Sequence, residues 1–382
     1  MTCPEPGDVP LSLYVHIPWC VRKCPYCDFN SHALKEELPE QAYVQALLED
    51  LRWQQPLAFG RKINSIFIGG GTPSLFSGVA IDDLLRGIRQ QLTVAPEAEI
   101  TLEANPGAAD ADHFAAYRAA GVNRLSIGAQ SFHTMHLKAL ERIHSPEQVR
   151  QAVSAASDAG FENINLDLMF GLPGQSLQQA LADLQQAVEL APAHISWYQL
   201  TIEPNTRFHH QPPPTPNEEL LWKIQQKGQG YLRKMGYAQY EVSAFAKPKM
   251  VGRHNLNYWT FGDYLAMGAG AHGKISMEDG VIRYSRERHP QAYMQMPGAK
   301  ANRRVLEAGD LQLEFMMNAM RLRQGVAIAL FEARTGLPFA RIGKEVKQAQ
   351  ASGLLETQPS RLQPTVRGQA FLNDLLILFD KG

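Results

Sequence analysis

One pattern repeats six times along the N-terminal half of the chain: a short apolar run rich in β-branched residues, then an amphipathic stretch of helical period. Strands that alternate with helices predict parallel βα units, and six units in succession favour a partial barrel over a doubly wound sheet. The apolar runs predict strands at residues 11–17, 65–70, 99–105, 124–130, 163–170 and 195–201. The amphipathic stretches predict helices between them, for example at 40–53, 81–92, 146–159 and 176–190. The sequence therefore predicts an α/β fold that begins with a partial (β/α)6 barrel.

Polar and glycine-rich segments follow the predicted strands. The parallel strands of such a barrel end at one rim, and chemistry in folds of this kind takes place there. The segments at that rim are 69–73, 103–106, 128–131, 171–174 and 199–205, with Asp167 just before the fourth. Each segment alone could be an ordinary turn, but together they predict a binding site.

The rest of the chain changes character after a proline-rich break at 212–216. A helix at 218–235 and a strand-like run at 237–245 come next, followed by the segment 254–259 and a glycine-rich stretch up to residue 273. The last part predicts helices, a two-stranded ribbon around Pro359 and a closing helix, an order that resembles a winged-helix module; the helices lie at 313–323, 327–335, 339–352 and 367–379. We therefore expect domains at 1–210, 211–300 and 301–382, the last mainly helical and used for packing.

Composition narrows the possible partners and the compartment. The formal net charge is −1 and there is no polybasic run, so electrostatics give no reason to expect nucleic acid or an anionic membrane as a partner. No segment approaches the ~20 apolar residues of a membrane helix, and the first residues lack an apolar signal core. The chain has four cysteines, three of them in one motif and the fourth, Cys3, incidental. This usage does not indicate disulfides and predicts a cytoplasmic protein.

The three clustered cysteines are Cys20, Cys24 and Cys27, in the spacing C-x3-C-x2-C. A 4Fe–4S cluster is normally held by four thiolates, so three ligands leave one iron open to a molecule from solution. The alternative is a structural zinc site, which requires a fourth ligand. His16 or His32 could supply that ligand.

With these cysteines and the rim segments, the chain resembles the radical S-adenosylmethionine (SAM) enzymes. Within them it resembles the HemN-like group, the oxygen-independent coproporphyrinogen dehydrogenases and their relatives. The resemblance covers almost the whole chain from Tyr14 onward and implies a radical-SAM barrel followed by a HemN-type C-terminal domain. It also implies a 4Fe–4S cluster on Cys20, Cys24 and Cys27, with SAM bound to the open iron.

The same resemblance assigns SAM-contacting positions to this sequence. A carboxylate facing the amine and ribose of SAM and an arginine facing its carboxylate are the charges that this ligand requires. The glycine run, which lacks Cβ atoms, is expected to approach the ligand closely and to offer its N–H groups. The residues that match are Gly70, Gly71, Thr72, Glu103, Gln130, Arg142 and Asp167, with Tyr14 and Tyr26 packing on the cluster or SAM.

Two features favour one subgroup. The coproporphyrinogen enzymes have a fourth cysteine where this chain has Phe29, and they have a longer extension before the motif than the residues that precede Tyr14 here. The pattern C-x3-C-x2-C-x-F, with the HNxxYW motif at 254–259, looks like that of the HemW heme chaperones. This resemblance implies heme binding, with His254 as the candidate iron ligand. His272 is a second candidate, whose alternative role is to shape a turn.

The leading hypothesis is thus a heme chaperone that passes heme to an unidentified acceptor protein and carries the cluster and exchangeable SAM. Contact with a membrane is expected only through that acceptor, and an electron donor is a further partner if SAM is cleaved. The alternatives are a coproporphyrinogen III oxidase and another radical-SAM reaction such as methylation. No residue is assigned a catalytic role.

Overall fold

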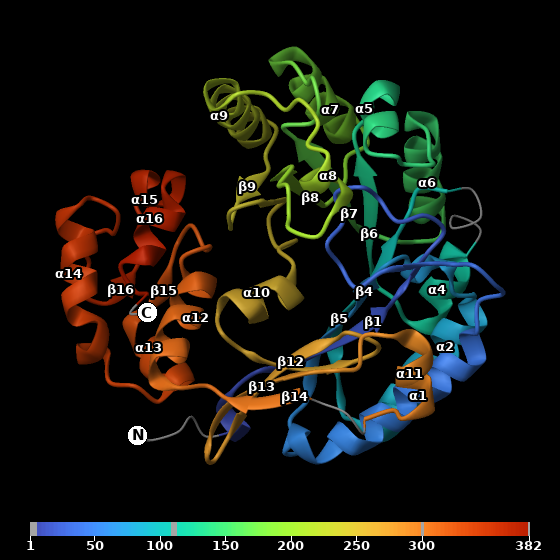
Figure 1. Cartoon of the computed structure of the whole chain (residues 1–382), viewed down its shortest axis with the longest axis horizontal. Coiled ribbons are helices and arrows are strands. Elements are labelled where there is room, and N and C mark those ends of the chain that lie inside the picture. The colour runs from blue at the N-terminus through green and yellow to red at the C-terminus, as the bar shows by residue number, and fades with distance from the viewer. Residues whose placement is uncertain (1–5, 108–112, 299–301, 381–382) are drawn as a thin grey trace.

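A computed structural model of the chain describes residues 6–107, 113–298 and 302–380; Cys3 lies outside these ranges. Its centre is a curved sheet of twelve strands in the order β14-β13-β12-β11-β1-β4-β5-β6-β7-β8-β10-β9 (Figure 1). The six predicted strands are β1, β4, β5, β6, β7 and β8, and they are parallel neighbours in chain order. Their bounds are Leu11–Ile17, Ile63–Gly70, Val94–Ala104, Arg124–Gln130, Asn163–Phe170 and His194–Gln199.

Helices cover the outer face of these strands. Ser145 and Ser176 begin α6 and α7 with capping boxes, in which the serine oxygen accepts from the N3 amide and the N3 glutamine side chain accepts in return. The helices of this part are α1 (Glu40–Gln54), α2 (Gly78–Gln91), α4 (Phe114–Ala120), α5 (Thr134–Ala139), α6 (Pro146–Asp158), α7 (Leu177–Glu189), α8 (Arg207–His210) and α9 (Glu218–Lys234), with short 3-10 turns at Pro6–Asp8, Gln55–Ala58 and Pro73–Leu75. The apolar faces of the larger helices and of the strands form one buried cluster.

Strands from the middle of the chain extend the sheet at both ends. At one end β10 (Ala244–Ala246) and β9 (Ala238–Gln239) add antiparallel to β8. The single strand predicted at 237–245 is therefore wrong: a turn separates two short strands. At the other end β11 (Asp263–Met267) lies parallel to β1, and β12 (His272–Met277), β13 (Gly280–Ser285) and β14 (Asn302–Val305) follow antiparallel. The edge strands β14 and β9 are not paired with each other, so the barrel is open.

The HNxxYW motif lies in a helix, α10 (Arg253–Trp259). This helix packs against β4 and β1 inside the curve of the sheet. A second short helix, α11 (Pro290–Gln295), packs on α1. The motif is thus part of the packing of the barrel.

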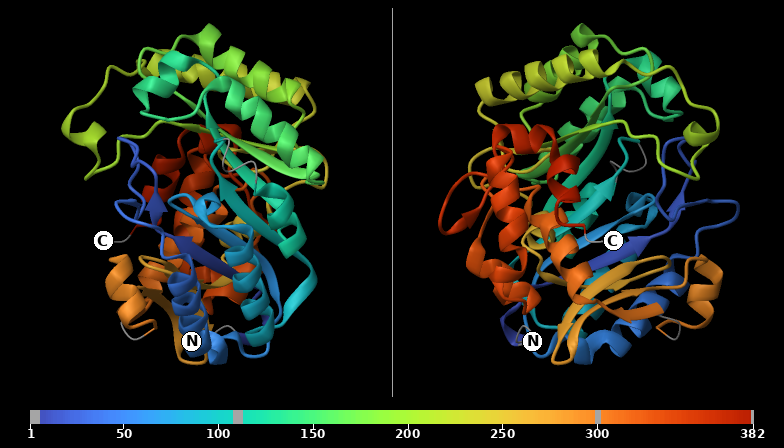
Figure 2. Two further views of the ribbon diagram at one scale, coloured as in Figure 1. Left: turned by 90° about the vertical axis from the view of Figure 1, so that its right-hand side faces the viewer. Right: turned by 60° about the vertical axis from the view of Figure 1, so that its left-hand side comes forward.

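The C-terminal module is mainly helical and has its own apolar cluster. Its elements are α12 (Ala308–Ala319), β15 (Val326–Ala327), α13 (Ile328–Thr335), a 3-10 turn (Phe339–Ile342), α14 (Gly343–Ala351), β16 (Arg361–Leu362), α15 (Val366–Ala370) and α16 (Leu372–Ile377). The ribbon predicted around Pro359 is reduced to a single antiparallel bridge between Leu355 and Pro364, and β16 pairs instead with β15, which lies before α13. The predicted closing helix is broken, because Phe371 between α15 and α16 leaves the helical conformation, with ψ at 50°. Figure 2 shows this module beside the barrel.

Within the described ranges, every helix is too short or too polar to span a membrane.

Candidate functional site

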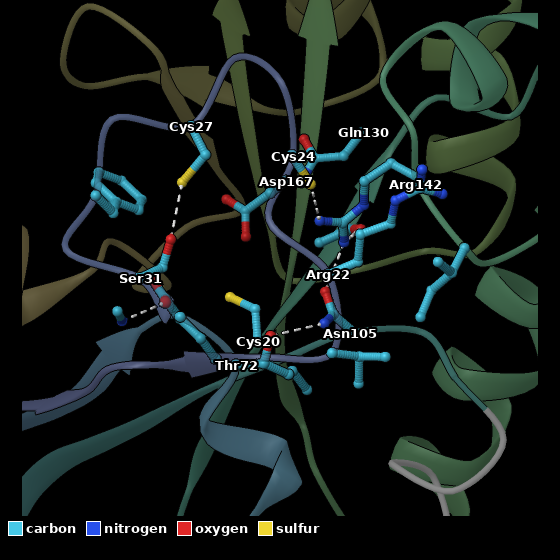
Figure 3. Close-up of a pocket in the computed structure, with 18 of the residues that line it drawn as sticks. Cys20, Arg22, Cys24, Cys27, Ser31, Thr72, Asn105, Gln130, Arg142 and Asp167 are labelled. Carbon is cyan, nitrogen blue, oxygen red and sulfur yellow. Dashed lines mark hydrogen bonds between the residues drawn. The ribbon is translucent and has the colours of Figure 1, made fainter. Parts of the chain in front are cut away.

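A pocket opens at the carboxyl ends of the parallel strands, where the sequence predicts the site. The predicted residues that line it are Cys20, Cys24, Tyr26, Cys27, Gly70, Gly71, Thr72, Glu103, Gln130, Arg142 and Asp167. Two residues of the predicted set, Tyr14 and His254, do not line this pocket. Figure 3 shows the three cysteines spaced around the pocket, with Arg142 and Asp167 facing into it.

The three cysteines come from one short segment. Cys20 ends β2 (Trp19–Cys20), and the other two lie in the loop that leads to β3 (His32–Ala33). The loop is held by its own contacts: the Cys27 amide donates to the Cys24 carbonyl oxygen at 3.2 Å, and β2 pairs with β3. Burial raises the pKa of the Cys20 and Cys27 thiols. A bound cation would therefore be needed to stabilise their thiolate forms.

The spacing of the thiols bears on the choice between zinc and a cluster. A single zinc ion needs its ligand atoms about 2 Å from one point. Across residues 6–107, 113–298 and 302–380, no three His, Cys, Asp or Glu side chains converge in that way. A cubane cluster bonds each cysteine to a different iron, which requires the three thiols to surround a volume. The three thiols lie at separate places on the pocket wall (Figure 3), as that requirement asks.

The glycine run at the end of β4 holds the cysteine segment through backbone hydrogen bonds. The Gly71 amide donates to the Ile17 carbonyl oxygen and the Thr72 amide to the Trp19 carbonyl oxygen, both at 2.7 Å. The Gly70 amide donates to Glu103 Oε2 at 3.1 Å. The expectation that these N–H groups face the ligand is therefore wrong, because all three are used within the protein. The glycines serve instead to bring two backbone segments together.

Gly71 is the tightest of these positions. A Cβ atom there would lie 2.4 Å from the Trp19 carbonyl oxygen and 3.0 Å from Cys20 Sγ. We expect Gly71→Ala to push β2 away, to lower the unfolding free energy by about 1–3 kcal/mol, and to reduce the iron bound after anaerobic reconstitution. Gly230→Ala is the matched control, because a Cβ there, within α9, meets no atom within 4 Å. Equal iron content in both variants would contradict this prediction.

Two partly buried carboxyl groups, Glu103 on β5 and Asp167 on β7, interact across β6, the strand that lies between them. Burial, reinforced by the charge of Asp167, raises the pKa of Glu103 to about 8. Burial also raises the pKa of Asp167, which accepts from Ser126 Oγ at 2.7 Å and from Asn165 Nδ2 at 2.9 Å. Two carboxylates close together in a buried site favour a cationic ligand, since a positive charge between them would offset both.

The raised pKa of Glu103 makes stability depend on pH. Between the ordinary value of 4.5 and about 8, the folded state holds a proton that the unfolded state has lost. The unfolding free energy of the ligand-free protein therefore falls as pH rises through this window. We expect Glu103→Gln to flatten the fall, leaving the part due to other carboxyl groups with a raised pKa, Asp167 and Asp183 among them, as measured by urea denaturation at pH 5, 6.5 and 8. An unchanged slope would contradict the assignment.

Arg142 connects the cysteine loop to the strand ends. Its guanidinium donates to Cys24 Sγ at 3.6 Å, to Asn105 Oδ1 at 2.5 Å and to the Gly128 carbonyl oxygen at 3.2 Å. Asn105 also donates to Thr72 Oγ1 at 3.1 Å. The sequence placed Asn105 at a strand end but did not single it out. Its signal was its position two residues after Glu103.

Gln130 is held by another residue that was not predicted. It ends β6 with a positive φ of 62°, and its Oε1 accepts from the hydroxyl of Tyr198 at 2.9 Å. Tyr198 lines the pocket one residue before the end of β8. Its place near a strand end was the only available signal.

Tyr14 and His254 lie deeper in the barrel. The Tyr14 hydroxyl is 2.9 Å from His16 Nδ1. His254 is 2 % exposed, and its ring nitrogens lie 2.9 Å from Ser65 Oγ and 2.9 Å from the hydroxyl of Tyr258. Burial lowers the pKa of His254 to about 3. With both nitrogens occupied, the ring has no free position for an iron atom, which argues against the predicted role as heme ligand.

The comparisons with known proteins agree with this architecture. The model of the radical SAM superfamily matches residues 14–187, and that of the HemN C-terminal domain matches 306–371. The heme chaperone HemW of Escherichia coli is 53% identical, covering 97% of this chain and 98% of that protein. The HemW of Haemophilus influenzae is 48% identical with the same coverage.

A solved structure supports the fold independently. The coproporphyrinogen III oxidase HemN of Escherichia coli, a radical SAM enzyme, superposes with a TM-score of 0.83, over 98% of this chain and 91% of that one, at 24% identity. At this identity the match concerns the fold alone. The HemW proteins match at high identity over nearly their whole length, so the chain belongs to the HemW family within the radical SAM superfamily.

Proposed function

We propose that this protein is a heme chaperone, which binds heme and passes it to an acceptor protein. The observation that carries the proposal is the 53% identity to the Escherichia coli heme chaperone over 97% of the chain. The pocket supports it, because the three thiols, two carboxyl groups and one arginine that the resemblance requires line one cavity.

The residues of the pocket divide the work of holding a cluster and SAM. Cys20, Cys24 and Cys27 would hold three irons of a 4Fe–4S cluster. When bound, the cluster would supply an electron and an open iron able to take the amino and carboxylate groups of SAM. Glu103 and Asp167 would face the cationic part of SAM, and Arg142 would face its carboxylate.

Phe29 bears on the choice between chaperone and enzyme. Its side chain is 57% exposed and lines the cluster pocket, at the position where the coproporphyrinogen enzymes have a cysteine. An apolar ring at this position favours the binding of a flat apolar molecule, and it lacks the thiolate that the coproporphyrinogen enzymes have there. The HemN fold keeps the oxidase as the alternative. Methylation is a further alternative.

The cellular setting is part of the same proposal. We place the protein in the cytoplasm, where its thiols stay reduced, and we expect any membrane contact to occur only through the acceptor. An electron donor is needed if SAM is cleaved. The domain bounds 1–210, 211–300 and 301–382 stay a prediction. Strands of the second range belong to the same sheet as those of the first.

The test is an anaerobic titration of the cluster-reconstituted protein with hemin, followed by Soret absorbance, with coproporphyrin III as competitor. We expect saturation near one heme per chain and no displacement by coproporphyrin. Absence of saturable binding would overturn the proposal. Conversion of coproporphyrinogen III to a decarboxylated product would favour the oxidase.

A further inference from the structure

A second cavity lies next to the cluster pocket, on the side of β11 to β14. It measures about 920 Å³, which is at the upper end of the range for small-molecule sites. Its wall includes four aromatic rings, those of Tyr14, Phe29, Tyr258 and Tyr264. Phe29 also lines the cluster pocket, so the two cavities meet at this residue. The aromatic wall suits a large flat ligand.

One imidazole in this wall is free. His272 begins β12 and is exposed, and within the described part of the chain neither of its ring nitrogens has a hydrogen-bond partner. His16 lines the same cavity, but its nitrogens lie 2.9 Å from the Tyr14 hydroxyl and 2.9 Å from the Asn30 carbonyl oxygen. His272 is thus the ring in this wall that can offer a lone pair.

The surroundings keep that lone pair available. Partial desolvation in the cavity wall lowers the pKa of His272, and the positive charges of Arg283 and Arg288 lower it further. A neutral imidazole is the form that binds a metal. The strand register also places His272 in the cavity wall. It pairs with Ser285 on β13, which pairs with Asn302 on β14, and all three residues line the cavity.

The charged groups of the cavity leave one cation unpaired. Arg286 lies 2.7 Å from Asp50 in a buried ion pair. Glu287 accepts from the His289 amide at 3.1 Å, and Asp28 also lines the wall. Arg288 is exposed and forms no ion pair with the described residues. Its guanidinium is available for a carboxylate such as a porphyrin propionate.

We propose that this second cavity is the heme-binding site and that His272 is the protein ligand to the heme iron. This inference rests on the proposed function and names its site. The porphyrin lies against Phe29 and Tyr264, and Arg288 binds a propionate. Heme is then separated from the cluster pocket by the Phe29 ring, and His254 stays a structural residue of the barrel.

The experiment compares hemin binding by the reconstituted full chain in four forms: wild type, His272→Ala, His254→Ala and His210→Ala. His210 is an exposed histidine on α8 and lines neither cavity. We expect His272→Ala to shift the Soret band and to raise the Kd of hemin about tenfold or more. Added imidazole should restore the wild-type spectrum in this variant, which a purely structural role would not allow. His210→Ala should bind as the wild type does.

Arg288→Gln gives a second, independent readout. It should weaken the binding of hemin but leave the binding of hemin dimethyl ester unchanged, because the ester has no propionate charge.

The possible failures are distinguishable. An unchanged spectrum and Kd in His272→Ala, with saturable binding by the wild type, would overturn the assignment of this site and leave the proposed function intact. A spectral change in His210→Ala or in a His254→Ala variant, with none in His272→Ala, would place the iron elsewhere. Absence of saturable binding by the wild type would overturn both the site and the proposed function.

Discussion

Replacement of Asp263 by alanine is expected to lower the unfolding free energy by about 3–5 kcal/mol, because it leaves two buried cations without their partner. Asp263 begins β11, the strand that joins the extension to the barrel. Its carboxylate lies 2.8 Å from the Arg61 guanidinium and 2.9 Å from the Lys274 ammonium, and its side chain is 0% exposed. Ser276 adds two hydrogen bonds, from its amide at 2.9 Å and its hydroxyl at 3.0 Å.

The pKa of Asp263 shows that these partners outweigh burial. Burial alone acts to raise the pKa, yet Lys274 and Arg61 hold it below its ordinary value. Lys274 also lies over the ring of Phe261, 4.3 Å from its centre, and that ring belongs to the apolar cluster of the C-terminal module. Loss of the carboxylate therefore disturbs both the sheet and the module that packs on it.

Urea denaturation at pH 7 measures the effect of Asp263→Ala. Glu219→Ala is the matched control, because Glu219 forms an exposed pair with Lys223 at 2.6 Å on α9, and solvent screening makes the loss of such a pair nearly neutral for stability. A loss of the same small size in both variants would show that the buried pairs contribute no more than surface pairs do.

The barrel strands were predictable because most residues in each of them are buried. A continuous apolar run indicates such a strand, and the predicted bounds of β1, β6 and β7 agree with the structure. The prediction for β5 began at residue 99, whereas the strand begins at Val94. Pro96 and Glu97 interrupt the apolar run there, and only the pairing of Val94 with Ile63 on β4 reveals the longer strand.

The pocket was predictable for a similar reason, and the role of His254 was not. Strand ends meet at one rim in any parallel barrel, so residues such as Glu103 and Asp167 could be grouped from the sequence. The environment of His254 depends on Ser65, 189 residues away, and on Glu99, 155 residues away. Local sequence carries no signal for such contacts. Ile17 and Trp19, whose carbonyl oxygens accept from the Gly71 and Thr72 amides, are distant from them in the same way.

Loss of one thiol tests the cluster assignment most directly. Cys24 is partly buried, and its Sγ accepts a long hydrogen bond from Arg142 at 3.6 Å. Its side chain therefore contributes little to folding. A cluster held by three thiolates already has one iron without a protein ligand. Removal of one of the three leaves two protein ligands for four irons.

We therefore expect Cys24→Ala to lose nearly all of its cluster while keeping the barrel folded. The measurement is iron and sulfide per chain after anaerobic reconstitution, with circular dichroism to check the fold. Cys3→Ala, which changes the cysteine outside the motif, should keep the full iron content. Full iron content in Cys24→Ala would remove this residue from the ligand set. Stoichiometric zinc in the wild type, with no sulfide, would replace the cluster by a zinc site and leave SAM without an iron to bind.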